Sequence, residues 1–138
     1  MKQLTVVAEH RPDTLSHMSY LLGRSHVSIQ NMTLSVAGSK AIIHFTVKEV
    51  ARAQAVLNAN GFRCFDSENL VVRLNNLPQE LDSLMHLLSQ NKIGHESPSL
   101  LSQEEACSLY ALKVEQPTKA NRVLAPYLGR EAEMVMTN

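Results

Sequence analysis

The chain has 138 residues, and its 13 Lys and Arg residues balance its 13 Asp and Glu residues, so its net charge is zero. A balanced, unclustered charge does not attract a polyanion, and 4% aromatic residues with no Trp provide no base-stacking platform, so we expect no nucleic-acid partner. The two cysteines make neither a disulfide framework nor a zinc-ligand spacing, and no apolar run approaches the roughly 18 residues of a membrane span. We expect a cytoplasmic protein with no membrane segment.

The apolar pattern of the first half predicts the order strand, helix, strand, strand, helix, strand. Short β-rich runs alternate there with apolar stripes at helical spacing. Pro12 suits the first turn of the first helix and Gly23 its end, while Asn60 and Gly61 are typical of the end of the second helix. The elements are expected at residues 4–8 (strand), 12–23 (helix), 27–36 and 41–47 (two arms of a hairpin), 50–57 (helix) and 62–65 (strand).

The second half predicts the same order with a poorer hairpin. Pro98 removes a backbone donor from the first arm, which indicates an edge or irregular strand. Pro126 has to lie at the end of the last helix or bend it. The elements are expected at residues 70–74 (strand), 78–91 (helix), 95–101 and 107–115 (two arms of a hairpin), 118–127 (helix) and 133–137 (strand).

Apolar positions recur along the chain with a constant step, which indicates a two-copy repeat. Examples are the pairs Leu4 and Leu70, Val6 and Val72, Leu15 and Leu81, and Leu22 and Leu88. One copy takes up about half of the chain, which is too long for a solenoid unit and long enough for a small domain. One copy alone, however, buries only about 60% of the surface that its unfolded chain exposes. We therefore expect two domains, residues 1–68 and 69–138, that support each other. The chain is predicted to be α+β, with tandem ferredoxin-like βαββαβ repeats, one in each domain, that have antiparallel sheets and the helices on one face.

The chain resembles the ACT domain, because each ferredoxin-like half has a tight turn with a proline between a strand and a helix. This family consists of small regulatory modules that bind amino acids at domain interfaces. Its turn signature is Asp or Asn, any residue, then Pro-Gly, and the matching tetrads are His-Arg-Pro-Asp at residues 10–13 and Asn-Leu-Pro-Gln at residues 76–79. The joint between the halves, from Gly61 and Phe62 through Leu70 to Pro78, is similar to the linker of small stand-alone tandem ACT proteins.

The resemblance implies that an amino acid binds at these turns, where two copies of the domain meet. Unpaired backbone N–H groups at a helix start can receive an α-carboxylate, and a polar residue before the proline can hold other polar groups. Asn76 matches the family's Asp or Asn and is the best single candidate, with His10 as its non-standard counterpart. The other residues implied at the two turns and the adjoining strand starts are Arg11, Pro12, Asp13, Leu77, Pro78, Gln79, Ser28, Gln30, Asn31, Gly94 and His95.

The sequence departs from the family signature after each proline, and it leaves more than one function open. Asp13 and Gln79 replace the glycine that lets main chain approach a ligand, and both turns also suit simple helix initiation. One hypothesis is an allosteric sensor that binds a free amino acid and forms a homodimer. A second is a ligand-free interaction module that regulates a partner enzyme of amino-acid metabolism. A third, weaker one is a detached regulatory subunit of a branched-chain amino-acid enzyme.

The sequence gives little support for a catalytic site or a metal site. The six histidines show no spacing typical of a helical metal pair, and the five glycines make no phosphate-binding loop. No serine lies in a nucleophile elbow. We therefore expect no enzyme activity, no cofactor and no metal.

Overall fold

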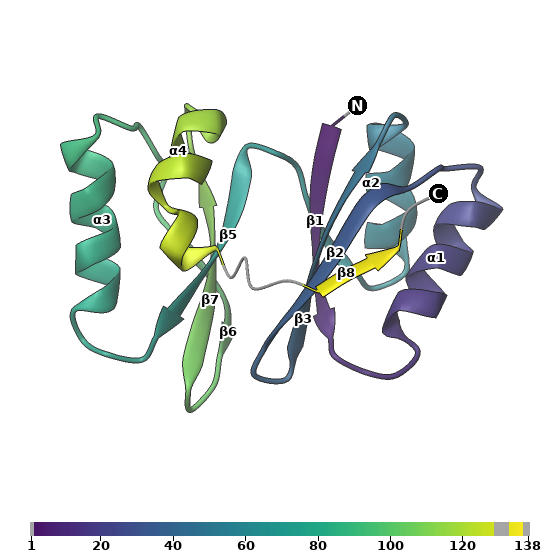
Figure 1. Ribbon diagram of the computed structural model, residues 1–138, viewed down its shortest axis with the longest axis horizontal. Helices are drawn as coiled ribbons and strands as arrows, with labels where there is room; N and C mark the ends of the chain where they lie inside the picture. Colours follow the sequence, from purple (N-terminus) through teal and green to yellow (C-terminus); the bar gives the residue numbers. More distant parts are fainter. Residues whose placement is uncertain (1, 129–132, 137–138) are drawn as a thin grey trace. The chain divides into compact units, whose positions relative to one another are not determined.

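A computed structural model describes residues 2–128 and the backbone of residues 133–136. The chain forms two compact units: residues 2–67 with strand β8, and residues 68–128 (Figure 1). The elements are β1 Lys2–Glu9, α1 Thr14–Arg24, β2 Gln30–Ala37, β3 Lys40–Val47, α2 Val50–Ala59, β4 Arg63–Phe65, β5 Asn69–Asn75, α3 Glu80–Gln90, β6 Ser99–Gln103, β7 Cys107–Lys113, α4 Pro117–Val123, the 3-10 turn Ala125–Tyr127 and β8 Glu133–Met136. The α+β class with antiparallel sheets is confirmed.

The first unit is built on a sheet with the strand order β4-β1-β3-β2-β8. Each neighbouring pair is antiparallel, and β1 lies between β3 and β4, with Val6 opposite Ile43 on one side and Cys64 on the other. The part β4-β1-β3-β2 is the arrangement of a split βαβ unit with its two hairpin-related strands. The predicted order β, α, β, β, α, β is confirmed for this half.

Alternate residues of these strands form the core of the first unit. Leu4 and Val6 of β1, with Phe45 of β3, are fully buried and lie in one cluster with Met18 of α1 and Leu57 of α2. Successive strand residues point to opposite faces of a sheet, so both helices cover the same face. Every second residue of these strands therefore faces the helices, and Figure 1 shows α1 and α2 together on that side of the sheet.

The second unit repeats this packing on a smaller sheet. Among the described residues its strand order is β5-β7-β6, with both pairs antiparallel. Leu70 and Val72, the repeat partners of Leu4 and Val6, lie in a second core cluster with Leu84 and Leu88 of α3 and Ala120 of α4. Pro98 directly precedes β6, whose register with β7 shifts between Leu100 and Ser102, so the predicted irregular edge strand is confirmed.

The last strand departs from the expected repeat. The repeat predicts a strand of the second half at residues 133–137, and β8 is present, but it pairs with Met32, Thr33 and Leu34 of β2 in the first sheet. Residue 137 lies outside the described residues. The outer edge of β2 offers unpaired N–H and C=O groups, and an added strand satisfies them. The pattern of apolar residues within one half does not indicate that its last strand pairs with the sheet of the other half.

Two of the predicted helix ends differ in detail. Gly23 lies inside α1, and the chain turns instead at His26, whose φ is 60°. Val27 donates its N–H to the carbonyl of Leu22, which closes the helix in the pattern usually made with glycine. Pro126 does end the last helix, since α4 stops at Val123 and a 3-10 turn follows.

The same helix closure recurs at the repeat partner of His26. Lys92 has a φ of 55°, and Ile93 donates its N–H to the carbonyl of Leu88. Gly61 closes α2 in the same way with a φ of 87°, as predicted. Two of these three positions therefore hold a side chain in a conformation that favours glycine.

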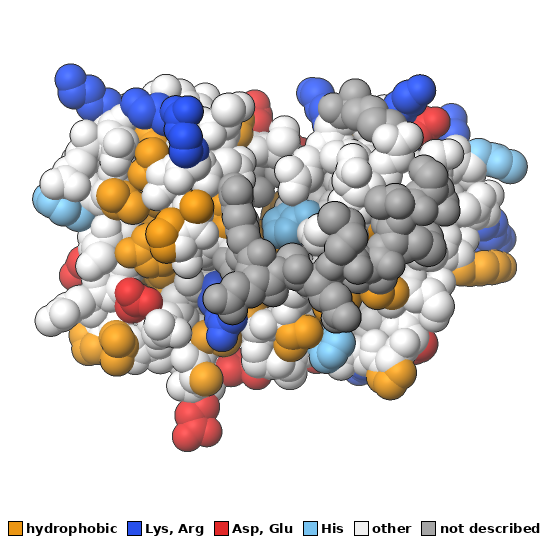
Figure 2. All heavy atoms as spheres, viewed as in Figure 1, with side chains coloured by type: hydrophobic (Ala, Val, Ile, Leu, Met, Phe, Trp, Pro, Cys, Tyr) orange, Lys and Arg blue, Asp and Glu red, His pale blue; other side chains and the backbone are white. Residues whose placement is uncertain are grey.

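Charged side chains of both signs appear on the visible face of each unit (Figure 2). Neither unit therefore shows a face of a single charge sign in this view. No helix among the described residues is long and apolar enough to cross a membrane.

Candidate functional site

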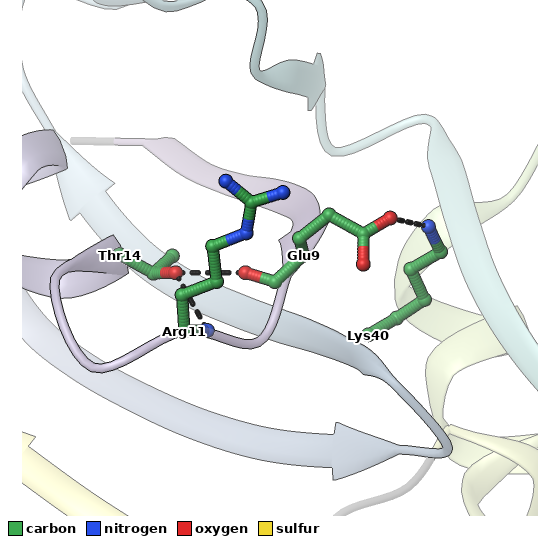
Figure 3. A network of polar contacts seen from close by, with 4 residues as sticks. All are labelled: Glu9, Arg11, Thr14 and Lys40. Carbon is green, nitrogen blue, oxygen red and sulfur yellow. Dashed lines mark hydrogen bonds and ion pairs between the residues drawn. The ribbon is translucent and has the colours of Figure 1, made fainter.

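The turn between β1 and α1 is held by the side chain of Thr14, which is 7% exposed. Its Oγ1 donates to the carbonyl of Glu9 at 2.7 Å and accepts the backbone N–H of Arg11 at 3.0 Å (Figure 3). One buried hydroxyl therefore ties the end of the strand to the start of the helix. It also fixes the backbone from which Arg11 and Asp13 project.

Two further contacts join this turn to the β2–β3 hairpin. The backbone N–H of His10 donates to the carbonyl of Ser39 at 2.8 Å. Lys40 donates a hydrogen bond to the carboxylate of Glu9 and forms an ion pair with it. This hydrogen bond and the Lys40 charge hold the pKa of Glu9 below its ordinary value of 4.5, and Arg11 adds a smaller effect in the same direction.

A cavity of about 210 Å³ lies beside this turn, within the first unit. Its walls come from the β1–α1 turn and from the turn between α2 and β4, which are far apart in the sequence. The lining residues are Ala8, Glu9, Arg11, Asp13, Thr14, His17, Asn60, Gly61 and Phe62. This volume is below the roughly 300 to 1,000 Å³ of sites for drug-sized ligands, so it suits a smaller molecule.

The cavity lining combines two unpaired charges with an aromatic wall. Among the described residues, the Arg11 guanidinium and the Asp13 carboxylate make no hydrogen bond or ion pair, and Figure 3 shows the guanidinium extending away from the Thr14 network. The rings of His17 and Phe62 lie 5.5 Å apart at a tilt of 55°. The cavity therefore offers a cation, an anion and an apolar surface to one small ligand.

The structure brings only part of the predicted first site together. Arg11 and Asp13 line the cavity, whereas His10 and Pro12 lie on the exposed turn outside its lining. Ser28 precedes β2, where the carbonyl of Gln30 accepts a hydrogen bond from Thr46 and the amide of Asn31 donates to the same hydroxyl at 3.5 Å. None of these three strand-start residues is among the residues that line the cavity.

The predicted second site is organised around Asn76. Its Nδ2 donates to the carbonyls of Glu104 and Glu105, and its Oδ1 accepts from the Ser108 hydroxyl at 2.6 Å. These bonds tie the β5–α3 turn to the β6–β7 turn of the same unit. Both amide hydrogens of Asn76 are therefore used within the protein, and a ligand contact by this residue stays a prediction.

The other predicted residues of the second half surround this turn or lie on the next strand connection. Leu77, Pro78 and Gln79 are exposed. The carbonyl of Gly94 accepts the N–H of Glu115, and an added Cβ at Gly94 would meet only the carboxylate at the flexible end of the Glu115 side chain. His95 makes a single bridge to Val114. Gly94 and His95 are therefore joined to the segment that follows β7, and their part in a ligand site also stays a prediction.

Several residues of the cavity were not predicted from the sequence as site residues. Thr14 and His17 lie within the predicted first helix, outside its apolar stripe, and the pattern at Asn60, Gly61 and Phe62 indicates a helix end and a short strand. Only the tertiary fold places the α2–β4 turn beside the β1–α1 turn. A signal was present in Gly61, whose φ of 87° the helix end requires, but it indicates backbone shape and not binding.

Cysteine and metal chemistry are not centred on this cavity. Burial raises the pKa of the Cys64 thiol to about 12, with a smaller contribution from Asp66, so the thiolate is scarce at neutral pH. The part of the chain that the structure describes contains no group of three or more His, Cys, Asp or Glu side chains arranged to hold a metal ion.

No protein-family model matches the sequence, and no curated protein matches it. Similar solved structures include a protein from Bacteroides thetaiotaomicron, with a TM-score of 0.47 and 16% identity over 97% of this chain and 90% of that one. The regulatory subunit of aspartate kinase from Thermus thermophilus gives 0.42 and 13%, covering 91% and 93% of the two chains. The acetolactate synthase small subunit from Thermotoga maritima gives 0.39 and 9%, covering 96% and 89%.

Proposed function

We propose that this protein is a non-enzymatic regulatory protein of the ACT type that binds a free amino acid at the β1–α1 turn of its first unit. The observation that carries the proposal is the cavity of about 210 Å³ with Arg11 and Asp13 on its wall, where neither side chain has a partner within the described part of the chain. A free amino acid carries a carboxylate and an ammonium group close together. The guanidinium of Arg11 suits the carboxylate, and the carboxylate of Asp13 suits the ammonium group.

The departure from the ACT signature at Asp13 is consistent with this proposal. An acidic residue at a helix start would repel a carboxylate that approaches the helix end. The same charge attracts the ammonium group, provided that the ligand carboxylate is held by Arg11 instead. The ligand is therefore oriented by two side chains, and it needs no glycine after the proline.

Regulation requires more than binding. A ligand shifts an equilibrium between two states only by the difference in its affinity for them. We propose that the bound amino acid stabilises one state of the protein, through which a second copy of the chain or a partner enzyme is controlled. The resemblance implies a site where two ACT-like copies meet, and we propose that a second copy covers the ligand bound at this turn.

A thermal-shift screen against the twenty amino acids, up to millimolar concentration, tests the proposal. A ligand at about one hundred times its Kd adds about 2.7 kcal/mol of stability, which raises the melting temperature by several degrees. A selective shift supports the proposal. If the folded protein shows no shift with any amino acid, the proposal is wrong.

The hydrogen bonds of Asn76 favour a second candidate function, a ligand-free interaction module. The side chain that matches the family's ligand contact is occupied by Glu104, Glu105 and Ser108. A protein that had lost its ligand would have no need of a free amide there. Isolation of a partner enzyme that binds with equal affinity with and without amino acids would favour this module over the sensor.

A further inference from the structure

The two turns that the repeat makes equivalent carry different charges. At the constant step of the repeat, Glu9, Arg11 and Asp13 of the first turn correspond to Asn75, Leu77 and Gln79 of the second. The Glu, Arg and Asp side chains of the first turn are therefore replaced by neutral ones. The groups that would recognise a zwitterion exist in the first unit and are missing from the corresponding positions of the second.

The hydrogen bonds of the two turns differ in the same sense. In the first unit the hairpin contacts are made by the backbone N–H of His10 and the carboxylate of Glu9, which leaves the side chains of Arg11 and Asp13 for other partners. In the second unit the equivalent residue, Asn76, makes that contact with its side chain. The backbone N–H of Asn75 is also occupied, by the carboxylate of Glu80 at 3.2 Å. The second turn is thus closed by its own polar groups.

We infer that each chain binds one amino acid, in the first unit, and that the ligand is a neutral amino acid with a short side chain. The inference rests on the proposed function and gives its ligand class and stoichiometry. Asn76 in the second unit then holds the β5–α3 turn to the β6–β7 turn and does not contact the ligand.

The charges of the cavity favour a ligand without net charge. Glu9 is neutralised by its ion pair with Lys40, which leaves Arg11 and Asp13 as one positive and one negative charge. These two charges match the zwitterion, so an additional charge on the ligand side chain would find no free partner among the lining residues. Arg11, Asp13 and His17 are exposed, so this preference comes from the balance of charges on the cavity wall and not from burial of the ligand, and it disfavours acidic and basic amino acids.

The size of the cavity favours a short side chain. The volume of about 210 Å³ is below the roughly 300 to 1,000 Å³ of sites for drug-sized ligands, which favours a small ligand. The carboxylate and ammonium groups of an amino acid, placed against Arg11 and Asp13, take up part of this space. The remainder, against His17 and Phe62, accommodates a side chain of the size found in alanine, serine or threonine.

Isothermal titration calorimetry of the full chain tests this inference. Alanine, serine and threonine are compared with leucine, phenylalanine, glutamate and lysine. We expect binding of a short neutral amino acid with a stoichiometry near one per chain, at least about tenfold tighter than that of the long or charged ones. A stoichiometry of two, or tightest binding of a long or charged amino acid, overturns the inference while the proposed function stands. No binding by any of the seven overturns the inference, and the thermal-shift screen against all twenty amino acids then decides the proposed function.

Variants assign the site to one unit. Arg11→Gln should weaken binding at least about tenfold, and Arg24→Gln, which removes an exposed guanidinium from the far end of α1, should leave it unchanged. Asn76→Ala, measured at a temperature where circular dichroism shows it to be folded, should keep both affinity and stoichiometry. Weaker binding by Asn76→Ala, with unchanged binding by Arg11→Gln, would place the ligand in the second unit and overturn the inference.

Discussion

Asn76→Ala should destabilise the protein by about 2 kcal/mol, although the residue is exposed, because it leaves a buried hydroxyl without a partner. The substitution removes two hydrogen bonds to the carbonyls of Glu104 and Glu105, which water can replace because that side of the turn is open. It also removes the acceptor of the Ser108 hydroxyl, and Ser108 is only 3% exposed. A buried hydroxyl without a partner costs about 1 to 3 kcal/mol, and the lost exposed bonds add a few tenths each.

Urea unfolding measured by circular dichroism determines this free energy of unfolding. The matched control is Gln79→Ala, which removes a side-chain amide from the same turn that makes no hydrogen bond among the described residues, and it should change stability by less than about 0.5 kcal/mol. In the double variant with Ser108→Ala, most of the loss should disappear because the unpaired hydroxyl is gone. If Asn76→Ala is as stable as the control, the reasoning that Asn76 holds the two turns together is refuted.

Three further predictions concern the helix ends, the Glu9 ion pair and the buried thiol. His26→Gly and Lys92→Gly should each raise stability by about 0.5 to 1 kcal/mol in urea, because glycine adopts the positive φ of 60° and 55° without strain, and a loss of stability would contradict this account. Because Lys40 lowers the pKa of Glu9, the stability that this pair contributes is present above pH 4.5 and is lost as the pH falls through the lowered pKa. In an NMR titration, Lys40→Gln should raise the pKa of Glu9, and an unchanged pKa would exclude the ion pair. Burial raises the pKa of Cys64 to about 12, so iodoacetamide at pH 8 should modify it only on unfolding, and rapid labelling of the folded protein, seen by mass spectrometry, would be inconsistent with that burial.

The elements and cores of both units could be predicted from the sequence because they depend on local periodicity. Leu4 and Val6 alternate on one face of a strand, and their repeat partners Leu70 and Val72 do so again, with all four at most 7% exposed. Met18 and Leu22 follow the helical period and face the same core. Such patterns specify which side of an element is buried, which is sufficient for the fold class.

The pairing of β8 with the first sheet could not be predicted, because a strand can add to an edge of either sheet. The hydrogen-bonding groups of β8 are those of any backbone, so nothing in its residues distinguishes the edge of β2 from an edge of the second sheet. The turn at His26 was missed for a related reason. Gly23 is the better residue for a helix end, but the packing of Val27 and the bond to Leu22 decide where α1 stops.

The candidate site was predictable only where it follows the β1–α1 turn. Arg11 and Asp13 were found from the turn signature, whereas His17, Asn60 and Phe62 come from positions whose local pattern indicates a helix face and a helix end. The ring contact at 5.5 Å between His17 and Phe62 depends on the tertiary packing of α1 against the α2–β4 turn. Asn76 was predicted as a ligand contact because its residue type matches the turn signature. The signature carries no information on tertiary contacts, so it does not show that the Asn76 side chain binds Ser108 and the β6–β7 turn.

The most direct measurement of the central claim is an amide NMR titration of the labelled full chain with the amino acid that gives the largest thermal shift. If the amino acid binds in the first unit, the backbone signals of residues 9–17 and 60–62, on the two turns that line the cavity, should move together with one dissociation constant. The signals of residues 75–79 should stay in place. Shifts confined to residues 75–79, with those of the first turn unchanged, would contradict the account.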